Sequence, residues 1–158
     1  RLYGGFAARI GLRQRVSYEG QAAMELEASA EKGSAGSLPF AVAEEEGKLI
    51  LDFSGAVRAA VDMRRRCVAM NDIAAAFQAT LPVAFIAVAE QIRNKTGLNR
   101  VVLGGGCFQN RMLLTACHRE LDRQGFEVFS HSLIPTNDGG IALGQAVCAA
   151  NIVKNGKG

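Results

Sequence analysis

The sequence predicts an α/β fold, and three observations lead to this prediction. Apolar residues recur at helical spacing along most of the chain, short β-branched runs alternate with helices in the last third, and glycine-rich turns connect the two. A chain of 158 residues, 49% of them hydrophobic, is long enough to bury one core. We therefore expect a single domain over residues 1–158.

Two helices are expected at the start of the chain. The first covers residues 1–12, where apolar side chains have helical spacing, and Gly11 is a suitable residue to end it. The second runs through Glu31, with Ser17 as its N-terminal cap. The glycine- and serine-containing segment 32–37 then forms a loop.

A β-hairpin is expected next, because two short apolar runs flank an acidic turn. The runs are Phe40–Ala43 and Lys48–Phe53, and residues 44–47 form the solvated tip.

Two more helices are expected over Ser54–Arg66 and Asn71–Lys95. Asn71 or Asp72 is a suitable N-terminal cap for the second of them, and Gly97 lies just past its end. Pro82 lies inside this helix and predicts a kink or a division into two helices.

The last third alternates strands and helices. We expect a strand over Arg100–Leu103, a glycine turn at 104–106 and a helix over Asn110–Gln124. A second strand over Phe126–Ser130, a loop over Pro135–Gly140 and a final helix over Ile141–Val153 follow. Strands joined through a helix are parallel neighbours, and ligands of such sheets bind beyond the carboxyl ends of the strands. Both glycine-rich loops are expected at that edge.

Composition excludes several classes of protein. Eighteen basic and fifteen acidic side chains leave a net charge of +3, which is too small an excess to predict a nucleic-acid partner. The four cysteines contain no C-x-x-C pair, so a zinc ribbon or a thioredoxin-like motif is not expected. The longest apolar stretch, Ile73–Ala89, is interrupted by polar residues and proline, so we expect a buried helix and no membrane contact. These features favour a cytoplasmic protein with reduced thiols. The absence of a first methionine favours a piece of a longer chain.

The glycine turn is the first candidate site. Gly105 and Gly106 lie between a strand and a helix that begins at Asn110, a setting in which backbone N–H groups can approach a phosphate. A tight strand-to-helix turn explains the same residues about equally well. Cys107 beside the turn is either a reactive thiol or, as we favour, a small buried residue.

Three carboxylates are further candidates. Asp138, in the loop before the final helix, is either a metal ligand or a helix cap, and the spacing alone favours the cap. Glu25 and Glu27 lie on one expected helix, where the spacing alone favours a solvated charged face. His118 is expected at the surface.

Four segments together resemble the C-terminal end of the HypF family, the carbamoyltransferases of [NiFe]-hydrogenase maturation. They are Arg1-Leu2-Tyr3, the run from Arg15 to Glu27 containing Tyr-Glu-Gly-Gln-Ala-Ala-Met-Glu-Leu-Glu, Gly-Gly-Cys-Phe-Gln-Asn-Arg at 105–111, and Asn-Asp-Gly-Gly-Ile-Ala-Leu-Gly-Gln-Ala at 137–146. The resemblance covers nearly the whole chain in order. Two positions depart from the family pattern, Gly4 where Asp is usual and Gly104 where Ser is usual.

The resemblance implies that the chain is the second, C-terminal lobe of a Kae1-like carbamoyltransferase module with an actin/Hsp70-like (ASKHA) fold, a mixed sheet flanked by helices. In such enzymes carbamoyl phosphate and ATP give a carbamoyl-adenylate at a separate domain. The Kae1-like module passes the carbamoyl group to the C-terminal cysteine of HypE. The first lobe and its metal-binding histidines are absent from this sequence, so this chain alone is expected to be inactive.

The resemblance also implies roles for six residues. Gly20 and Glu25 match positions near the nucleotide ribose, and Gly105, Gly106 and Asn110 match the loop against adenosine and phosphates. Asp138 matches a ligand of a divalent metal shared with the missing lobe, which raises the ligand interpretation above the cap. No residue in this chain is expected to act as a catalytic acid or base.

Two alternative functions remain open. One is a non-catalytic module that docks a protein through the apolar helix Ile73–Ala89. The other is a subunit of a tRNA-threonylcarbamoyl-transferase-like enzyme, for which Pro-Gly-Gly would be usual where Glu19-Gly20-Gln21 stands.

Overall fold

The computed structural model describes residues 1–156, and it confirms the α/β class. The described part contains α-helices, short strands and two 3-10 turns in the order α1 (Leu2–Ile10), α2 (Gln21–Ala30), β1 (Ala41–Glu45), β2 (Lys48–Asp52), α3 (Ser54–Arg65), α4 (Met70–Thr96), β3 (Arg100–Leu103), η1 (Gly106–Gln109), α5 (Arg111–Arg123), β4 (Glu127–Ser130), η2 (Asp138–Gly140) and α6 (Ile141–Asn155).

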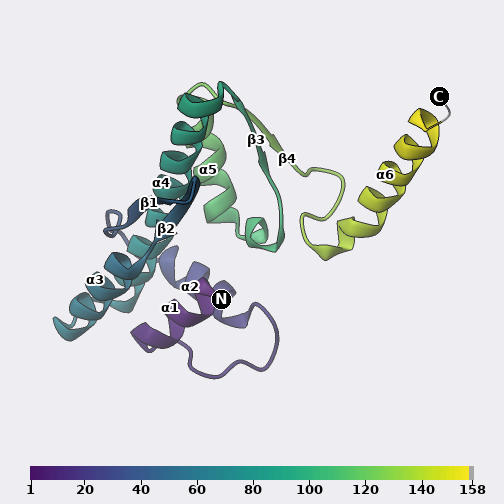
Figure 1. Ribbon diagram of the computed structural model, residues 1–158. Helices are drawn as coiled ribbons and strands as arrows, with labels where there is room; N and C mark the ends of the chain where they lie inside the picture. The colour runs from purple at the N-terminus through teal and green to yellow at the C-terminus, as the bar shows by residue number, and fades with distance from the viewer. Residues whose placement is uncertain (157–158) are drawn as a thin grey trace.

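Helix α4 is the centre of the fold. Helices α2, α3 and α5 and both strands of the hairpin pack against it (Figure 1). Phe77 of α4 is fully buried, and its ring stacks on Phe6 of α1 with centroids 3.9 Å apart. The ring of Tyr3 meets Phe77 edge-on at 5.4 Å. These contacts join α1 to α4, so the first helix of the chain is part of the same core.

The expected division of α4 at Pro82 is wrong. The helix continues for 27 residues through Pro82, which is itself buried. A proline in a helix interior removes one backbone hydrogen bond, but packing on several sides stabilises the turns before and after it. By length and composition α4 could cross a membrane, yet 61% of its most apolar window is buried inside the protein.

The expected cap of α4 is also wrong. The helix begins at Met70 after Ala69, one residue before Asn71. Asn71 Oδ1 instead accepts a hydrogen bond from Ser29 Oγ at 2.8 Å, and Asp72 Oδ1 accepts one from the N–H of Ser34 at 2.9 Å. Both side chains therefore tie α4 to α2 and to the loop that follows α2.

Helix α2 begins later than expected. Its N-cap is Gly20, with φ of 80°, and Ser17 does not cap it. The N–H of Ser17 instead donates to Gln21 Oε1 at 2.8 Å. The predicted end of α1 at Gly11 is confirmed, since Gly11 adopts the left-handed conformation that ends many helices.

The strands form two separate pairs in the described part of the chain. The expected hairpin is confirmed: β1 and β2 are antiparallel, and Glu46 and Gly47 at the turn both have positive φ. The expected parallel pair is confirmed as well, with Val101 opposite Val128. Antiparallel and parallel pairing are thus both present, but in two sheets, because the hairpin packs on α4 whereas β4 packs on α5.

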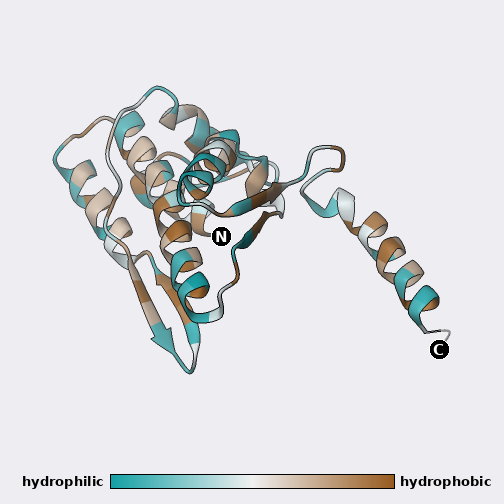
Figure 2. Ribbon diagram, turned by 90° about the horizontal axis from the view of Figure 1, so that it is seen from above, coloured by the Kyte–Doolittle hydropathy of each residue, from teal (hydrophilic) through white to brown (hydrophobic). Residues whose placement is uncertain are grey.

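Part of the apolar surface is uncovered. Val102 and Phe129, opposite each other on β3 and β4, are 69% and 45% exposed. Helix α6 confirms the expected final helix, but it buries no side chain and lies apart from the other helices (Figures 1 and 2). Figure 2 shows that apolar residues lie along its whole length.

We expect Phe77→Ala to lower the free energy of unfolding by about 3–5 kcal/mol, because it opens a cavity beside Phe6 at the centre of the core. Urea denaturation of the 158-residue chain measures this loss. Phe129→Ala is the matched control, since its ring is 45% exposed and its loss should stay within about 0.5 kcal/mol. Equal losses in the two variants would contradict the central position of Phe77.

Candidate functional site

Two loops at the carboxyl ends of β3 and β4 are joined by hydrogen bonds. The N–H of Gly105 donates to the carbonyl of Thr136 at 2.9 Å, and Thr136 Oγ1 donates to the carbonyl of Gly105 at 3.1 Å. Parallel pairing brings these ends to the same edge. The glycine loop and the loop before Asp138 are therefore neighbours, as expected from the sequence.

The glycine loop does not run directly into α5. The 3-10 turn η1 comes between them, and Gly105 before it has φ of 92° and ψ of 163°, a conformation open to glycine. Gly106 is exposed, and a Cβ built on it would meet no atom within 4 Å. As the first residues of η1, Gly106 and Cys107 have no backbone acceptor for their N–H groups among the described residues.

Asn110 is the N-cap of α5. Its Oδ1 accepts a hydrogen bond from the N–H of Leu113 at 2.8 Å. Its Nδ2 is buried and has no partner in the described part of the chain. Asn110 thus has a structural role, and it also keeps an unused donor beneath the glycine loop.

Glu27 has a role that the sequence analysis missed. Its Oε1 accepts a hydrogen bond from the N–H of Met112 at 3.1 Å, in the first turn of α5. The expected solvated face is therefore wrong for Glu27. A helix N-terminus attracts negative charge, and the carboxylate of Glu27 already occupies that position at the start of α5. A phosphate would have to bind at the glycine loop itself.

Glu25 points to a different partner. It forms a two-point ion pair with Arg13, at 2.7 Å to Nε and 2.6 Å to Nη2, and its Oε1 also accepts from Gln21 Nε2 at 3.0 Å. The hydrogen bond from Arg13 holds the pKa of Glu25 below its usual range. Three of about four acceptor positions on this carboxylate are occupied. Glu25 can therefore accept one further hydrogen bond.

The predicted site residues come together only in part. Gly105, Gly106, Asn110 and the loop of Asp138 share one edge, whereas no hydrogen bond among the described residues links Gly20 or Glu25 to that edge. Helix α2 reaches it through Glu27, on the opposite side of the helix from Glu25.

His131 also lies at this edge, and the sequence did not predict it as a site residue. It follows β4, and a Cβ on Gly104 would lie 3.5 Å from its Nε2. It lines a small cavity of about 80 Å³ together with Leu103, Phe108, Leu114, Ser130, Ile134 and Thr136. The position directly after a strand of a parallel sheet was the signal that could have identified it.

Asp138 is the one metal ligand that was predicted in this chain. It is exposed and begins η2, whose N-cap is Asn137. Within residues 1–156 no three histidine, cysteine or acidic residues are grouped as a metal site requires. The residues present therefore do not make a complete metal site.

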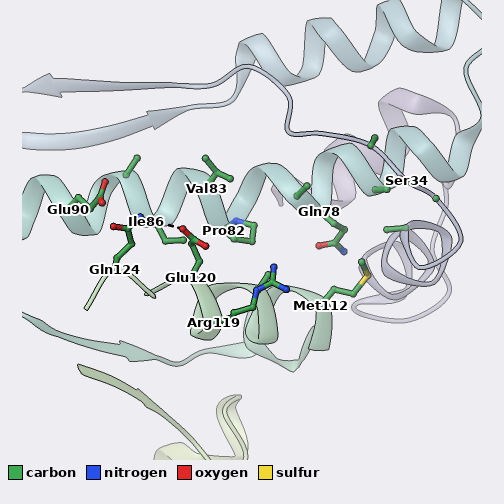
Figure 3. Close-up of a pocket in the computed structure, with 17 residues that line it drawn as sticks. Ser34, Gln78, Pro82, Val83, Ile86, Glu90, Met112, Arg119, Glu120 and Gln124 are labelled. Atoms are coloured by element: carbon green, nitrogen blue, oxygen red, sulfur yellow. Dashed lines mark hydrogen bonds between the residues drawn. The ribbon is translucent and has the colours of Figure 1, made fainter. Parts of the chain in front are cut away.

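A larger hollow lies elsewhere, between α4, α5 and the loop after α2 (Figure 3). Its volume is about 990 Å³, and none of the six predicted site residues lines it. We call it the α4–α5 hollow. Its lining includes Ser34, Gln78, Pro82, Val83, Ile86, Glu90, Met112, Arg119, Glu120 and Gln124.

Cysteine and tyrosine environments differ across the fold. Burial raises the pKa of Cys117 to about 11. Cys107 is exposed, so the expectation that it is buried is wrong. Burial also raises the pKa of Tyr3, with smaller contributions from Cys107, Glu27 and Cys117. Tyr3 therefore stays protonated and acts as a hydrogen-bond donor.

We expect Cys117 to resist alkylation at pH 8 while Cys67, Cys107 and Cys148 react. A pKa of about 11 leaves about one thiol in a thousand ionised at pH 8, and burial also blocks access. The ionised fraction rises with pH, so labelling should accelerate toward pH 11. Iodoacetamide labelling followed by peptide mass mapping measures each rate, with urea-unfolded chain as the control. Rapid labelling of Cys117 in folded protein would contradict its burial.

Comparison with known proteins gives a consistent result. Residues 1–145 match the family described as carbamoyltransferase, Kae1-like domain, second subdomain. Carbamoyltransferase HypF of Rhizobium leguminosarum bv. viciae is 38% identical over 157 residues, which are 98% of this chain and 20% of that protein. The chain thus spans about a fifth of the length of this relative.

Solved structures agree. A crystal structure of full-length HypF in the phosphate- and nucleotide-bound form matches with a TM-score of 0.90 and 40% identity, over 96% of this chain and 20% of that one. The HypF of T. kodakarensis matches with a TM-score of 0.80 over 98% of this chain and 20% of that one; at 23% identity it supports the fold alone.

Proposed function

The chain belongs to the HypF family of carbamoyltransferases, as the second subdomain of their Kae1-like domain, and from this premise we propose that it forms the nucleotide-binding half of a carbamoyl-transfer site. The observation that carries the proposal is the likeness, over nearly all of this chain, to a HypF described as phosphate- and nucleotide-bound. The exposed glycine loop at the edge of the β3–β4 pair supports it, because ligands of parallel sheets bind at that edge.

The nucleotide would contact the chain at three places. The N–H groups of Gly106 and Cys107 suit phosphate oxygens, since Glu27 already occupies the N-terminus of α5. Glu25 would accept one ribose hydroxyl, because Arg13 and Gln21 use the other positions of its carboxylate. Gly20 and Asn110 complete the proposed contacts through their backbone and amide groups.

In the whole protein the proposed reaction moves a carbamoyl group from carbamoyl-adenylate to the C-terminal cysteine of HypE. The new bond joins the carbonyl carbon to the cysteine sulfur, the bond to the phosphate oxygen of the adenylate breaks so that AMP leaves, and the thiol proton is released to solvent. Carbamoyl phosphate and ATP are the proposed substrates that form the adenylate. We propose a cytoplasmic site for this chemistry. We propose no nucleic-acid partner.

We propose Asp138 as the ligand that this chain supplies to a divalent metal. One exposed carboxylate cannot hold the ion, so the other ligands would come from the rest of the protein. The same reasoning leads us to propose that this chain alone does not catalyse transfer, because its half-site is open to water.

We expect Gly106→Val to weaken binding of an adenosine nucleotide about tenfold or more in the full-length protein while leaving it folded. A side chain here has free space and no positive φ to strain, but it would cover the N–H groups of the loop. Isothermal titration measures the affinity and circular dichroism checks the fold. Gly36→Val is the matched control, because Gly36 has equal free space outside the site. Unchanged affinity in a folded Gly106 variant removes the loop from the site, whereas an absence of binding heat with the unaltered protein favours a docking module that binds no nucleotide.

We expect Asp138→Ala to reduce both the metal content and the turnover of the full-length protein. Elemental analysis and mass spectrometry of the carbamoylated HypE peptide measure the two losses. Asp62→Ala is the control, since Asp62 is an exposed carboxylate on α3 whose ion-pair partner within residues 1–156 is Arg65. A metal content equal to that of the unaltered protein would mean that Asp138 acts only at the start of η2.

A further inference from the structure

His131 is a polar side chain at the candidate site that the proposed contacts leave unused. It directly follows β4, so it lies at the same carboxyl edge of the strand pair as the glycine loop. The other histidine of the chain, His118, bonds Asp122 at 2.8 Å. His131 is exposed, and neither of its ring nitrogens has a hydrogen-bond partner among residues 1–156. The ring therefore has at least one N–H donor available to a ligand.

The tip of the His131 ring faces the start of the glycine loop. A Cβ on Gly104 would lie 3.5 Å from Nε2 and 3.9 Å from Cδ2, so these two atoms are the part of the ring nearest to that residue. Because Gly104 has no side chain, nothing on that residue covers Nε2. The loop is fixed beside the ring, since two hydrogen bonds join Gly105 to Thr136. Nε2 thus lies beside the backbone that leads into Gly106.

The small cavity that His131 lines is not a suitable place for a charged ligand. Its volume is about 80 Å³, which is room for about two or three water molecules. Leu103, Phe108 and Ile134 are among its walls. An anion would lose its hydration there without enough donors in return. A ligand of His131 would therefore approach from solvent, along the glycine loop.

One phosphate group can reach both His131 and the loop. The N–H groups of Gly106 and Cys107 have no backbone acceptor among the described residues. The nitrogen of Gly106 lies at most about 6 Å from the Cα of Gly104, because less than two Cα–Cα steps separate them. A phosphate that accepts hydrogen bonds of about 2.8 Å on different oxygens spans donors about 5–8 Å apart. The edge therefore offers two backbone donors and one side-chain donor within the reach of a single phosphate.

We propose that His131 donates a hydrogen bond from Nε2 to a phosphate oxygen of the bound adenosine nucleotide, while other oxygens of that phosphate face the N–H groups of Gly106 and Cys107. This inference rests on the proposed nucleotide site and adds to it a side chain that recognises the phosphate and not the nucleoside. A hydrogen bond to a charged acceptor contributes more than one between neutral groups. His131 thus favours AMP over adenosine.

Affinities for AMP and for adenosine test the proposal. In the full-length protein, His131→Ala should weaken binding of AMP about tenfold and change the affinity for adenosine less than about twofold, both measured by isothermal titration. His118→Ala is the matched control, because it removes the other imidazole of this subdomain from the surface of α5, and it should change neither affinity. Equal losses for AMP and adenosine would mean that His131 only supports the shape of the loop, which would overturn the proposal.

Two further replacements separate hydrogen bonding from packing. His131→Gln keeps an N–H donor at about the reach of Nε2, whereas His131→Phe keeps a planar ring without a donor. His131→Gln should retain most of the affinity for AMP, and His131→Phe should lose it as fully as His131→Ala. Circular dichroism checks that each variant is folded. Equal AMP affinities in the Gln and Phe variants would show that the donor has no part in binding, and the proposal would be wrong.

The inference and the proposed function fail in different ways. If the unaltered full-length protein binds AMP and His131→Ala binds it equally well, the nucleotide site stands and the role of His131 is wrong. If the unaltered protein binds neither AMP nor adenosine, the proposed function is wrong and the role of His131 is wrong with it.

Discussion

The burial of α4 is the constraint on which the rest of the structure depends. This helix has apolar side chains on nearly all sides, and elements from every part of the chain before β3 pack on it. The stack of Phe77 on Phe6 joins α1 to it, and polar contacts from Asn71 and Asp72 fix α2 and its loop. Because so many neighbours contact α4, it can keep a proline in its interior without dividing.

The glycine loop gains its position from two sets of polar contacts. Thr136 joins it to the loop after β4, and Glu27 joins α2 to the start of α5 directly behind it. The second contact also changes the chemistry of the site. A carboxylate at the N-terminus of α5 satisfies the helix dipole from within the protein, so the exposed amides of the loop are the backbone donors left open at this edge.

The uncovered surfaces are consistent with one subdomain of a larger domain. Val102 and Phe129 form an exposed apolar pair on a two-stranded parallel sheet, a kind of sheet that is normally covered on both faces. Helix α6 buries none of its side chains. Such features are costly in a complete domain but ordinary where further polypeptide completes the packing.

Sequence by itself determined much of this protein. Periodicity and turn residues predicted the helices and the hairpin, because these depend on contacts between residues close in the chain. The parallel pair followed from two strands joined through a helix. The motif around Gly105 and the run ending at Glu27 identified the family. The glycine loop and the loop of Asp138 were expected at one edge, because parallel strands bring their ends together.

Tertiary structure alone decided the roles of individual polar residues. Glu25 and Glu27 are two positions apart on one helix, yet one binds Arg13 and the other binds the start of α5, 85 residues away. Asn71 and Asp72 have the composition of a cap but bond α2 and its loop instead. The local sequence pattern indicates which residues can donate or accept a hydrogen bond. Their partners depend on which distant segment of the chain packs against them.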